Sequence, residues 1–428
     1  MQEGWQYSII TELADLSDKT KSSLSQSAES GEATPFLSFA FLELLSSSKS
    51  VDGDSGWYSH HLLIRDASQT SEEDKMPVVA LVPCYLKTHS YGEYVFDHSW
   101  AHAYEQHGLA YYPKLVCAIP FTPVTGARAL IDERFRAEGV SQTDVFTFIN
   151  RHKQSILDSA KASSLHLLFS PQTCSDSLNS LGMHQRLSVQ FVWSNDGYKS
   201  FDDFMAALTS RKRRSIRKER APFADATPAS EANTSSTIQI NTLYGDALTQ
   251  DVIDAFYLCY QQTYFKRSGH AGYLRAAFFD NLLTAMRDSV CIVAAFKQNE
   301  MIAGSLFFYN EHALFGRYWG ALEEVSGLHF ECCYYRGIDF AIKQNIQTFN
   351  PGTQGEHKIL RGFRPTFCFS NHALLEPAFD KAVEDFVKRE RYSIEQYHAQ
   401  ASEVLPYKQI EQSEHKANDA HRNIADDQ

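Results

Sequence analysis

Residues 346–365, IQTFNPGTQGEHKILRGFRP, join a short apolar segment to a loop crowded with charged side chains. The apolar residues 346–349 predict a buried strand, which Asn350-Pro351-Gly352 ends. Two glycines further on allow the backbone to turn tightly or to approach a ligand closely. The polar residues of this loop are Gln354, Glu356, His357, Lys358, Arg361 and Arg364. A strand that leads into such a loop favours a functional site over a plain connection.

The chemistry of this loop allows both anion binding and proton transfer. An acid and an imidazole, Glu356 and His357, can exchange protons, while Lys358 and Arg361 can hold a negative charge. The alternative is a surface turn with a rim of ion pairs.

The residues before the loop predict a series of helices and strands. Apolar residues spaced three and four apart predict helices over residues 251–264, 273–287 and 328–344. Between the second and third helices, three apolar runs predict strands over residues 290–296, 301–309 and 313–319.

The first half of the chain repeats this order. It predicts a helix, several strands, a second helix and closing strands at residues 36–45, 57–64, 78–86, 115–121, 141–156, 164–169 and 187–193. The repetition predicts an α+β fold with two similar domains, each a mixed, mostly antiparallel sheet flanked by helices.

The predicted domains are residues 1–195 and 196–401, and the second begins with a basic helix at residues 201–220. Three segments are poor in apolar residues and are expected to be disordered: 22–34, an insertion at 221–236, and a tail at 402–428.

Four long motifs carry a family resemblance. They are YLKTHSYGEYVFDHSWAHAY from Tyr85, YYPKLVCAIPFTPVTGAR from Tyr111, the RKRR helix, and HFECCYYRGIDFAIKQN from His329 continuing into the 346–365 loop. The chain resembles the FemAB-like, peptidoglycan biosynthesis or recognition group of the GNAT acyltransferase superfamily, from about residue 35 to residue 397. The resemblance implies tandem GNAT-like domains around a shared cleft, with acyl-CoA or aminoacyl-tRNA as the donor substrate.

Composition narrows the class of protein. A net charge of −12 argues against broad nucleic-acid binding, and no DNA partner is expected. No apolar run reaches the length of a membrane span, and the first residues lack the features of a secretory signal. Eight scattered cysteines without a CxxC pair fit reduced thiols, so we expect a cytoplasmic location.

Residues 211–220, RKRRSIRKER, hold seven cations and one acid, which makes a local charge of +6 in an acidic chain. Arg211 and Arg214 lie on one stripe of the predicted helix and are expected to bind substrate phosphate. The phosphate of a small ligand, the backbone of a tRNA and a merely solvated helix face remain open as interpretations.

The segment from Tyr85 to Tyr104 is dense in hydrogen-bonding side chains. Glu93, Asp97, His98 and Trp100 are expected to line a substrate pocket. His98 and His102 have the i, i+4 spacing of a zinc pair, but no third ligand is visible, so no metal is predicted. The alternative is a helix cap at Asp97 with Trp100 in the core.

Residues 120–130, PFTPVTGARAL, occupy the position at which GNAT enzymes bind the pyrophosphate of acyl-CoA. Only Gly126 and Arg128 match that signature, and they are the candidate cofactor-binding residues. The corresponding segment of the second half, GALEEVSGL at residues 320–328, has two acids and no cation. It should repel pyrophosphate, a departure that matches Fem-type enzymes, which take aminoacyl-tRNA.

These observations predict an acyl- or aminoacyl-transferase that acts on an amine, such as one on a cell-wall precursor. Glu356 or His357 would accept the amine proton, and Lys358 and Arg361 would stabilise the oxyanion or a phosphate. These four residues are expected to face Asp97 and His98 across the cleft. The alternatives are a non-catalytic recognition module for an anionic ligand and a CoA-dependent N-acetyltransferase.

Overall fold

The computed structural model describes residues 2–25, 32–69, 76–224, 238–353 and 355–408. Helices and mostly antiparallel strands alternate along the chain, which confirms the predicted α+β class. The strands are β1 (Trp5–Ile10), β2 (Leu24–Ser25), β3 (Trp57–Ser59), β4 (His61–Asp66), β5 (Val78–Val82), β6 (Cys84–Lys87), β7 (Lys114–Cys117), β8 (Leu130–Asp132), β9 (Ser164–Ser170), β10 (His184–Ser194), β11 (Gln239–Tyr244), β12 (Val290–Lys297), β13 (Glu300–Tyr309), β14 (Ala313–Ala321), β15 (Thr348–Asn350) and β16 (Arg364–Leu374).

The helices cover both faces of the strands. The α-helices are α1 (Asp18–Ser23), α2 (Phe39–Ser47), α3 (His98–Gln106), α4 (Glu133–Ala137), α5 (Gln142–Arg151), α6 (Lys153–Ala160), α7 (Gln172–Ser180), α8 (Phe201–Ala207), α9 (Ser210–Arg220), α10 (Gln250–Ser268), α11 (Ala276–Met286), α12 (Leu328–Phe330), α13 (Arg336–Lys343) and α14 (Pro377–Glu403). A π-helical segment, η6 (Glu331–Tyr335), joins α12 to α13, and short 3₁₀ helices include η2 (Pro35–Leu37), η3 (Ala221–Phe223) and η7 (Glu356–Arg361).

Eleven strands of the described chain form one sheet, in the order β11-β12-β13-β14-β15-β10-β16-β9-β7-β6-β3. The pairs β7–β9 and β14–β15 are parallel, and the other pairs in this sheet are antiparallel. Each parallel pair lies at the same position in its half of the chain, so the sheet keeps the internal repeat that the sequence predicts. A second sheet has the order β1-β4-β5-β8-β2.

The two longest strands, β10 and β16, connect the halves. The last strand of the first half, β10, pairs with β15 of the second half, and β16 pairs in turn with β9 of the first half. The two also pair with each other from His184↔His372 to Val192↔Arg364. Each half therefore completes its sheet with the other's last strand, and the sheet crosses the predicted division at residue 195.

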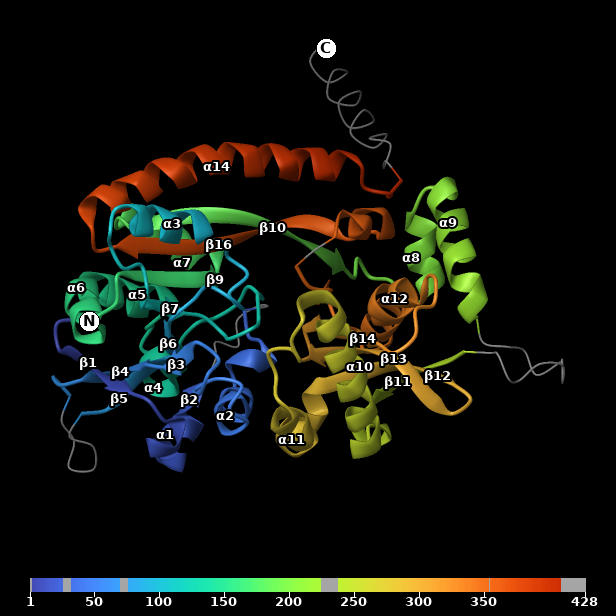
Figure 1. Ribbon diagram of the computed structural model, residues 1–428, viewed down its shortest axis with the longest axis horizontal. Coiled ribbons are helices and arrows are strands. Elements are labelled where there is room, and N and C mark those ends of the chain that lie inside the picture. The colour runs from blue at the N-terminus through green and yellow to red at the C-terminus, as the bar shows by residue number, and fades with distance from the viewer. Residues whose placement is uncertain (1, 26–31, 70–75, 225–237, 354, 409–428) are drawn as a thin grey trace, which may run out of the picture.

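The hydrophobic core is also shared between the halves. Phe36 in η2 makes edge contacts with Phe308 and Phe315 of the second half, at centroid distances of 5.2 and 5.3 Å. Phe41 in α2 contacts Phe278 in α11 at 6.0 Å. The helix α14 lies along β10 and β16, across the join (Figure 1). This shared core holds the loops of both halves in fixed relative positions.

Some boundaries differ from the prediction. Residues 22–25, expected to be disordered, end α1 and form β2, while residues 26–31 lie outside the described chain. The single basic helix at residues 201–220 is two helices, α8 and α9. At the start of the predicted insertion, Phe223 is buried in η3. A single aromatic side chain can pack on the core even where the surrounding sequence is polar. Residues 225–237 are outside the described chain.

The predicted disordered tail begins later than residue 402. Residues 402–403 belong to α14, and Tyr407 forms a bridge with Leu208 and donates a hydrogen bond to the Gly362 carbonyl at 2.5 Å. The bridge with Leu208 and the hydrogen bond of the Tyr407 phenol hold this segment on the protein. Residues 409–428 lie outside the described chain. In the described part, no helix is both long and apolar enough to cross a membrane.

Candidate functional site

The strands β14 and β15 separate just before the loop at residues 351–362. Their parallel pairing ends at Phe315↔Asn350. A Cβ on the next residue, Gly316, would lie 3.2 Å from the Cα of Pro351, so a glycine gives the loop close passage at this point. The Asn350 side chain accepts a hydrogen bond from the Gly352 amide at 2.9 Å. The chain therefore leaves the sheet in a fixed direction.

The loop continues into the 3₁₀ helix η7 between two glycines with positive φ. Gly355 has φ 110° and Gly362 has φ 89°, and side chains with a Cβ rarely adopt such angles. The turns bring His357, Lys358 and Arg361 back toward α9 and toward the π-helical segment η6. Together with His329, these three residues form what we call the cation cluster.

Lys358 is 1% exposed. Its ammonium donates to the Gly352 carbonyl at 2.6 Å, and no ion pair joins it to a carboxylate in the described chain. Burial lowers the pKa of Lys358 to about 7. At neutral pH this lysine is therefore poised between its charged and neutral forms, which is unusual for a lysine and typical of reactive sites.

His357 lies half-buried beside Lys358. Its Nε2 lies 2.8 Å from the hydroxyl of Tyr334 in η6. Burial, and then the charges of Arg361 and Lys358, lower the pKa of His357. Burial and the His357 ring lower the pKa of nearby His329 to about 4. Both imidazoles are thus neutral at neutral pH and able to accept protons.

Arg361 is 7% exposed and ties the loop to α9. Its guanidinium donates to Glu219 at 2.7 Å and stacks on the Phe330 ring, 3.6 Å from the centroid. Tyr335 donates to the same Glu219 carboxylate at 2.6 Å. Burial, then Arg211 and Arg361, lower the pKa of Lys212 on α9. Glu219 lies among several cations here, an arrangement that suits an anion site.

Glu356 is placed differently from its neighbours. Its side chain is exposed at the first position of η7, where it accepts a hydrogen bond from Tyr397 of α14 at 3.1 Å. The 3₁₀ turn directs it away from the buried side of the loop. Of the three predicted catalytic residues, the structure brings His357 and Lys358 together and leaves Glu356 outside.

In the first half, Glu93 and Asp97 lie in the interior. The side chain of Lys114 on β7, 0% exposed, donates to Glu93 at 2.7 Å and also to Asp97. Tyr111 donates to Asp97 at 2.7 Å. Lys87 is also fully buried and donates to the carbonyls of Gly56 and Tyr91. We call Lys87, Glu93, Asp97 and Lys114 the carboxylate cluster.

The two acids of the carboxylate cluster differ in proton affinity. Burial raises the pKa of Glu93 to about 7, in spite of Lys114. Burial also opposes ionisation of Asp97, but Lys114 outweighs it, so the pKa of Asp97 is lowered. Burial tends to lower the pKa of Lys114, yet Glu93 and Asp97 raise it overall. The side chains of Glu93 and Asp97 thus pair with Lys114 in the interior, and their substrate-lining role stays a prediction.

Trp100 and His98 face opposite directions. Trp100 is 5% exposed and packs on His372 at 5.0 Å, which is the core role left open as the alternative. His98 is exposed, between the rings of Tyr91 and Phe96 at 6.4 and 6.3 Å. Only His98 of the four predicted residues is accessible. The described residues include no group of three or more side chains arranged to hold a metal.

The two predicted loops border a shared pocket, but not through the predicted side chains. This pocket, of about 250 Å³, is lined by residues 94–96 of the first half, Thr353 of the second, and β10. Glu93 and Asp97 flank the lining segment 94–96 in the sequence. Lys358 donates a hydrogen bond to the carbonyl of Gly352, the residue before Thr353. None of Glu356, His357, Lys358, Arg361, Asp97 and His98 lines this pocket, and the expectation that they face one another across a cleft stays a prediction.

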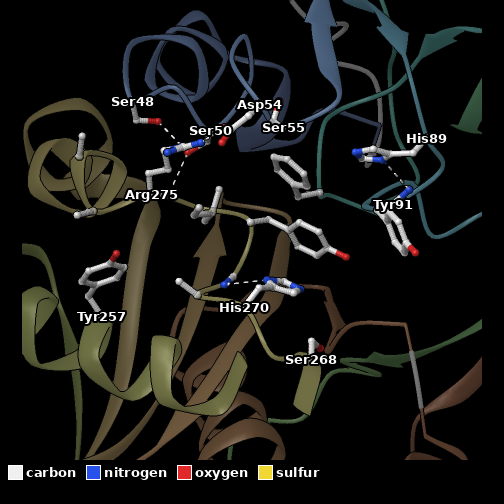
Figure 2. Close-up of a pocket in the computed structure, with 17 residues that line it drawn as sticks. Ser48, Ser50, Asp54, Ser55, His89, Tyr91, Tyr257, Ser268, His270 and Arg275 are labelled. Carbon is white, nitrogen blue, oxygen red and sulfur yellow. Dashed lines mark hydrogen bonds and ion pairs between the residues drawn. The ribbon is translucent and has the colours of Figure 1, made fainter. Parts of the chain in front are cut away.

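A larger pocket, of about 970 Å³, lies between the halves (Figure 2). From the first half it is lined by Ser48, Ser50, Asp54, Ser55, His89, Tyr91 and Phe121, and from the second by residues 268–277 and Tyr257. An ion pair between Arg275 and Asp54 crosses its rim. Its lining is aromatic and hydroxyl-rich, and its one arginine is paired.

Three aromatic residues beside these pockets have a left-handed backbone. Tyr94 has φ 61°, Phe121 has φ 57° and Phe169 has φ 54°. Phe121 stacks on Tyr273 at 4.9 Å in the larger pocket, and Tyr94 and Phe169 line the smaller one. Such conformations cost free energy and gather at functional sites. Their common location supports the pockets as the working region.

Gly126 and Arg128 are buried within the first half. Arg128 is 2% exposed, and its guanidinium donates to the carbonyls of Val124, Gly126, Ala127 and Leu168. A Cβ on Gly126 would lie 2.7 Å from the Glu32 carbonyl. The arginine therefore stabilises its own loop, and the cofactor-binding role of these two residues stays a prediction.

The acids of residues 320–328 are less repulsive than the sequence suggested. Glu323 pairs with Lys297 at 2.7 Å, and Glu324 pairs with Lys266 of α10. These residues border a pocket of about 680 Å³ that also contains Arg267, Trp319 and His329 of the cation cluster. The lysines come from other elements, so the sequence of the turn alone could not show them.

Comparison with family models identifies the family of this chain. The model of the FemAB-like family, described as peptidoglycan biosynthesis/recognition, matches residues 14–409. The chain belongs to the FemAB-like family. No curated protein matches it.

Among solved structures, the FemAB-like chain is similar to FemX, with 10% identity, a TM-score of 0.47, and coverage of 89% of this chain and 100% of that one. It is also similar to a tandem GNAT protein from the clavulanic acid biosynthesis pathway, with 9% identity, a TM-score of 0.44, and coverage of 87% and 99%. L-PGS from Bacillus licheniformis matches at 10% identity and a TM-score of 0.40, with coverage of 72% and 86%.

The FemAB-like chain also holds residues that sequence reasoning missed. The segment His270-Ala-Gly-Tyr273-Leu-Arg275 lines the larger pocket, between α10 and α11. A glycine with aromatic and charged neighbours between two helices was the available signal. Glu219 and His329 were missed because their partners lie in distant parts of the chain.

Proposed function

We propose that this FemAB-like protein is an acyl- or aminoacyl-transferase that acts on an amine of a peptidoglycan-type precursor. The observation that carries the proposal is Lys358, a buried lysine without a carboxylate partner in the described chain. Its lowered pKa and its place in a glycine-bounded loop fit a group that meets negative charge during a reaction.

In the proposed reaction, an amine nitrogen of the acceptor attacks the carbonyl carbon of an activated ester. A C–N bond forms, and the carbonyl oxygen takes a negative charge in the tetrahedral intermediate. The protonated Lys358 ammonium would stabilise this oxyanion in place of the Gly352 carbonyl that it now contacts. The ester bond to the leaving oxygen or sulfur then breaks, and an amide results.

Proton transfer falls to His357 in this scheme. The attacking nitrogen must lose a proton, and the leaving group must gain one. His357 is neutral at neutral pH because burial and neighbouring cations lower its pKa. It lies directly before Lys358 and in hydrogen-bond reach of Tyr334, whose hydroxyl can orient the ring. The proton taken from the amine would return to the leaving group.

The larger pocket is the proposed acceptor site. Its size, of about 970 Å³, suits a ligand of several rings or residues. The stacked pair Phe121–Tyr273 and the serine hydroxyls offer flat apolar faces beside hydrogen-bonding groups. Residues from both halves line it, so both halves would contribute to acceptor recognition.

The donor would approach from the side of the cation cluster. Arg361, Lys212 and Arg267 give this side a positive surround for a phosphate-bearing donor. Acyl-CoA and aminoacyl-tRNA both carry phosphates. Since Gly126 and Arg128 are buried, a CoA-type donor would use the pocket near Trp319 and His329.

The test is a transfer assay with a UDP-linked muramyl pentapeptide as acceptor. Radiolabelled acetyl-CoA and a mixture of labelled aminoacyl-tRNAs serve as alternative donors, and mass spectrometry follows the acceptor. An acceptor heavier by one acyl or aminoacyl group is the expected product. The same product must be lost with Lys358→Met.

Binding measured in parallel separates turnover from recognition. If calorimetry shows that the muramyl peptide binds while no donor gives a product, the recognition-module alternative replaces the transferase. If only acetyl-CoA gives a product, the protein is a CoA-dependent N-acetyltransferase. Equal turnover by the wild type and Lys358→Met would contradict the assignment of the site.

A further inference from the structure

The outward side of α9 consists of cations. At about 100° per residue, Arg217, Arg214, Lys218 and Arg211 fall within an arc of about 120°, which they share only with Ser210 at the start of the helix. All four side chains are exposed, and no ion pair involves them in the described chain. We call these four residues the α9 array.

The opposite side of α9 is fixed to the body of the protein. Ile216 is 1% exposed in the second-half core. Arg220 pairs with Glu331 and Asp339 at 3.0 and 2.7 Å, and Glu219 pairs with Arg361. The charges of the α9 array therefore stand on a rigid helix and hold a fixed pattern.

The α9 array is convex, and only one of its members borders a pocket. Arg217 lines a hollow of about 470 Å³, whereas Arg211, Arg214 and Lys218 line none of the five pockets described in this chain. A small phosphate ligand is bound by groups that converge on it. Cations that diverge from a helix surface instead fit an extended anionic partner.

We propose that the α9 array docks the protein onto an anionic lipid surface. A row of cations on one exposed helix face is the usual electrostatic footprint of a protein that binds such membranes. The helix lies at the edge of the molecule, where a flat surface can approach it (Figure 1). This docking is independent of the proposed reaction.

Nearby residues favour an anionic membrane surface over an RNA as the partner of the α9 array. An RNA backbone needs cations along a track of several elements, but α8, which precedes the array, exposes Asp202 and Asp203. No aromatic residue lies among the cations to stack on bases. Close to the start of α9, Thr209 bonds to Pro406, and Val404 beside it is 56% exposed. An exposed valine next to cations suits the headgroup region of a bilayer.

The experiment is sedimentation of the full chain with vesicles. The vesicles contain phosphatidylcholine alone or with about 30 mol % phosphatidylglycerol. The wild type should bind only the anionic vesicles, and about 0.3 M salt should weaken the binding. The triple variant Arg211→Gln, Arg214→Gln, Lys218→Gln should bind about 100-fold more weakly, roughly fivefold per lost cation.

A matched control removes the same charge elsewhere. Lys381→Gln, Lys388→Gln, Arg389→Gln on exposed positions of α14 lowers the net charge equally and should bind like the wild type. Circular dichroism confirms that both variants are folded. Equal loss in both variants would reduce the effect to net charge and overturn the proposal. Absence of wild-type binding to anionic vesicles, or binding of bulk tRNA instead, would also overturn it.

Discussion

Two of the three buried lysines, Lys114 in the first half and Lys358 in the second, have opposite surroundings. Lys114 is 0% exposed and lies between the carboxylates of Glu93 and Asp97. Lys358 is 1% exposed and contacts only a backbone carbonyl in the described chain. The acids raise the pKa of Lys114 against the effect of burial, whereas burial lowers the pKa of Lys358 to about 7.

The difference in surroundings suits Lys114 to a structural role and Lys358 to a reactive one. A buried ammonium that is paired with two carboxylates keeps its proton and gains little from binding another anion. An unbalanced one is unstable in its charged form and is stabilised by any anion that reaches it. Burial alone therefore does not distinguish the two lysines, whereas the presence or absence of a paired carboxylate does.

The largest expected effect tests the balanced lysine. Lys114→Met removes the ammonium that pairs with the buried Glu93 and Asp97 and leaves only Lys87 near them, so the free energy of unfolding should fall by about 3–5 kcal/mol. Thermal and urea denaturation, followed by circular dichroism, measure the loss. A further change of both acids, to Gln and Asn, should recover much of it, because no buried charge then remains unpaired. A loss below about 1 kcal/mol would show that the cluster is hydrated.

The unbalanced lysine should respond in the opposite way. Lys358→Met should lower turnover by about 10- to 1000-fold, the range for loss of one group that stabilises an oxyanion. Stability at pH 7 should not fall, since the lost bond to Gly352 is more than offset by removal of an unpaired buried charge. Lys343→Met, at an exposed position of α13, is the control and should keep full activity.

The pH dependence of stability offers a finer comparison. The pKa of Lys358 is about 7 in the folded protein and about 10.4 in an unfolded chain. Between these values the unfolded chain binds more protons, so this lysine makes stability rise with pH. Lys358→Met lacks this term. Relative to the wild type it should be most stable near pH 7 and lose about 2 kcal/mol of that advantage by about pH 9.

Unfolding curves for both proteins at the two pH values measure this difference. A gap that does not change with pH would mean that Lys358 keeps an ordinary pKa, through a water or an anion that screens it. In that case the comparison with Lys114 would lose its basis.

Much of the fold could be predicted from local pattern. The strands β12, β13 and β14 and the helices α10 and α11 follow apolar periodicity, and their predicted bounds are close to the observed ones. The glycine-bounded loop was also predictable, because Gly355 and Gly362 are needed where φ is positive. These features depend on neighbours within a few residues.

The exchange of β10 and β16 could not be predicted. The pairing His184↔His372 joins residues far apart in the sequence. The sequence of neither strand indicates which strand it pairs with. The internal pairing of Glu93 and Asp97 was missed for the same reason. Their partner Lys114 lies on another strand, and only the folded chain shows that it satisfies them. Local pattern predicts elements, while charge balance depends on tertiary contacts.

The smallest expected effect concerns Glu356, at the border of the cation cluster. Glu356 could serve as the general base, in which case Glu356→Gln would cost about 10²- to 10⁴-fold in turnover. Its carboxylate, however, is exposed and accepts a hydrogen bond from Tyr397, outside the buried part of the loop. Glu356→Gln should therefore change turnover by less than about threefold, as expected for an exposed residue away from the chemistry. Steady-state kinetics beside Lys358→Met make the comparison. A loss for Glu356→Gln as large as that of Lys358→Met would mean that η7 rearranges in the substrate complex, so that Lys358 acquires the counter-charge that it lacks here.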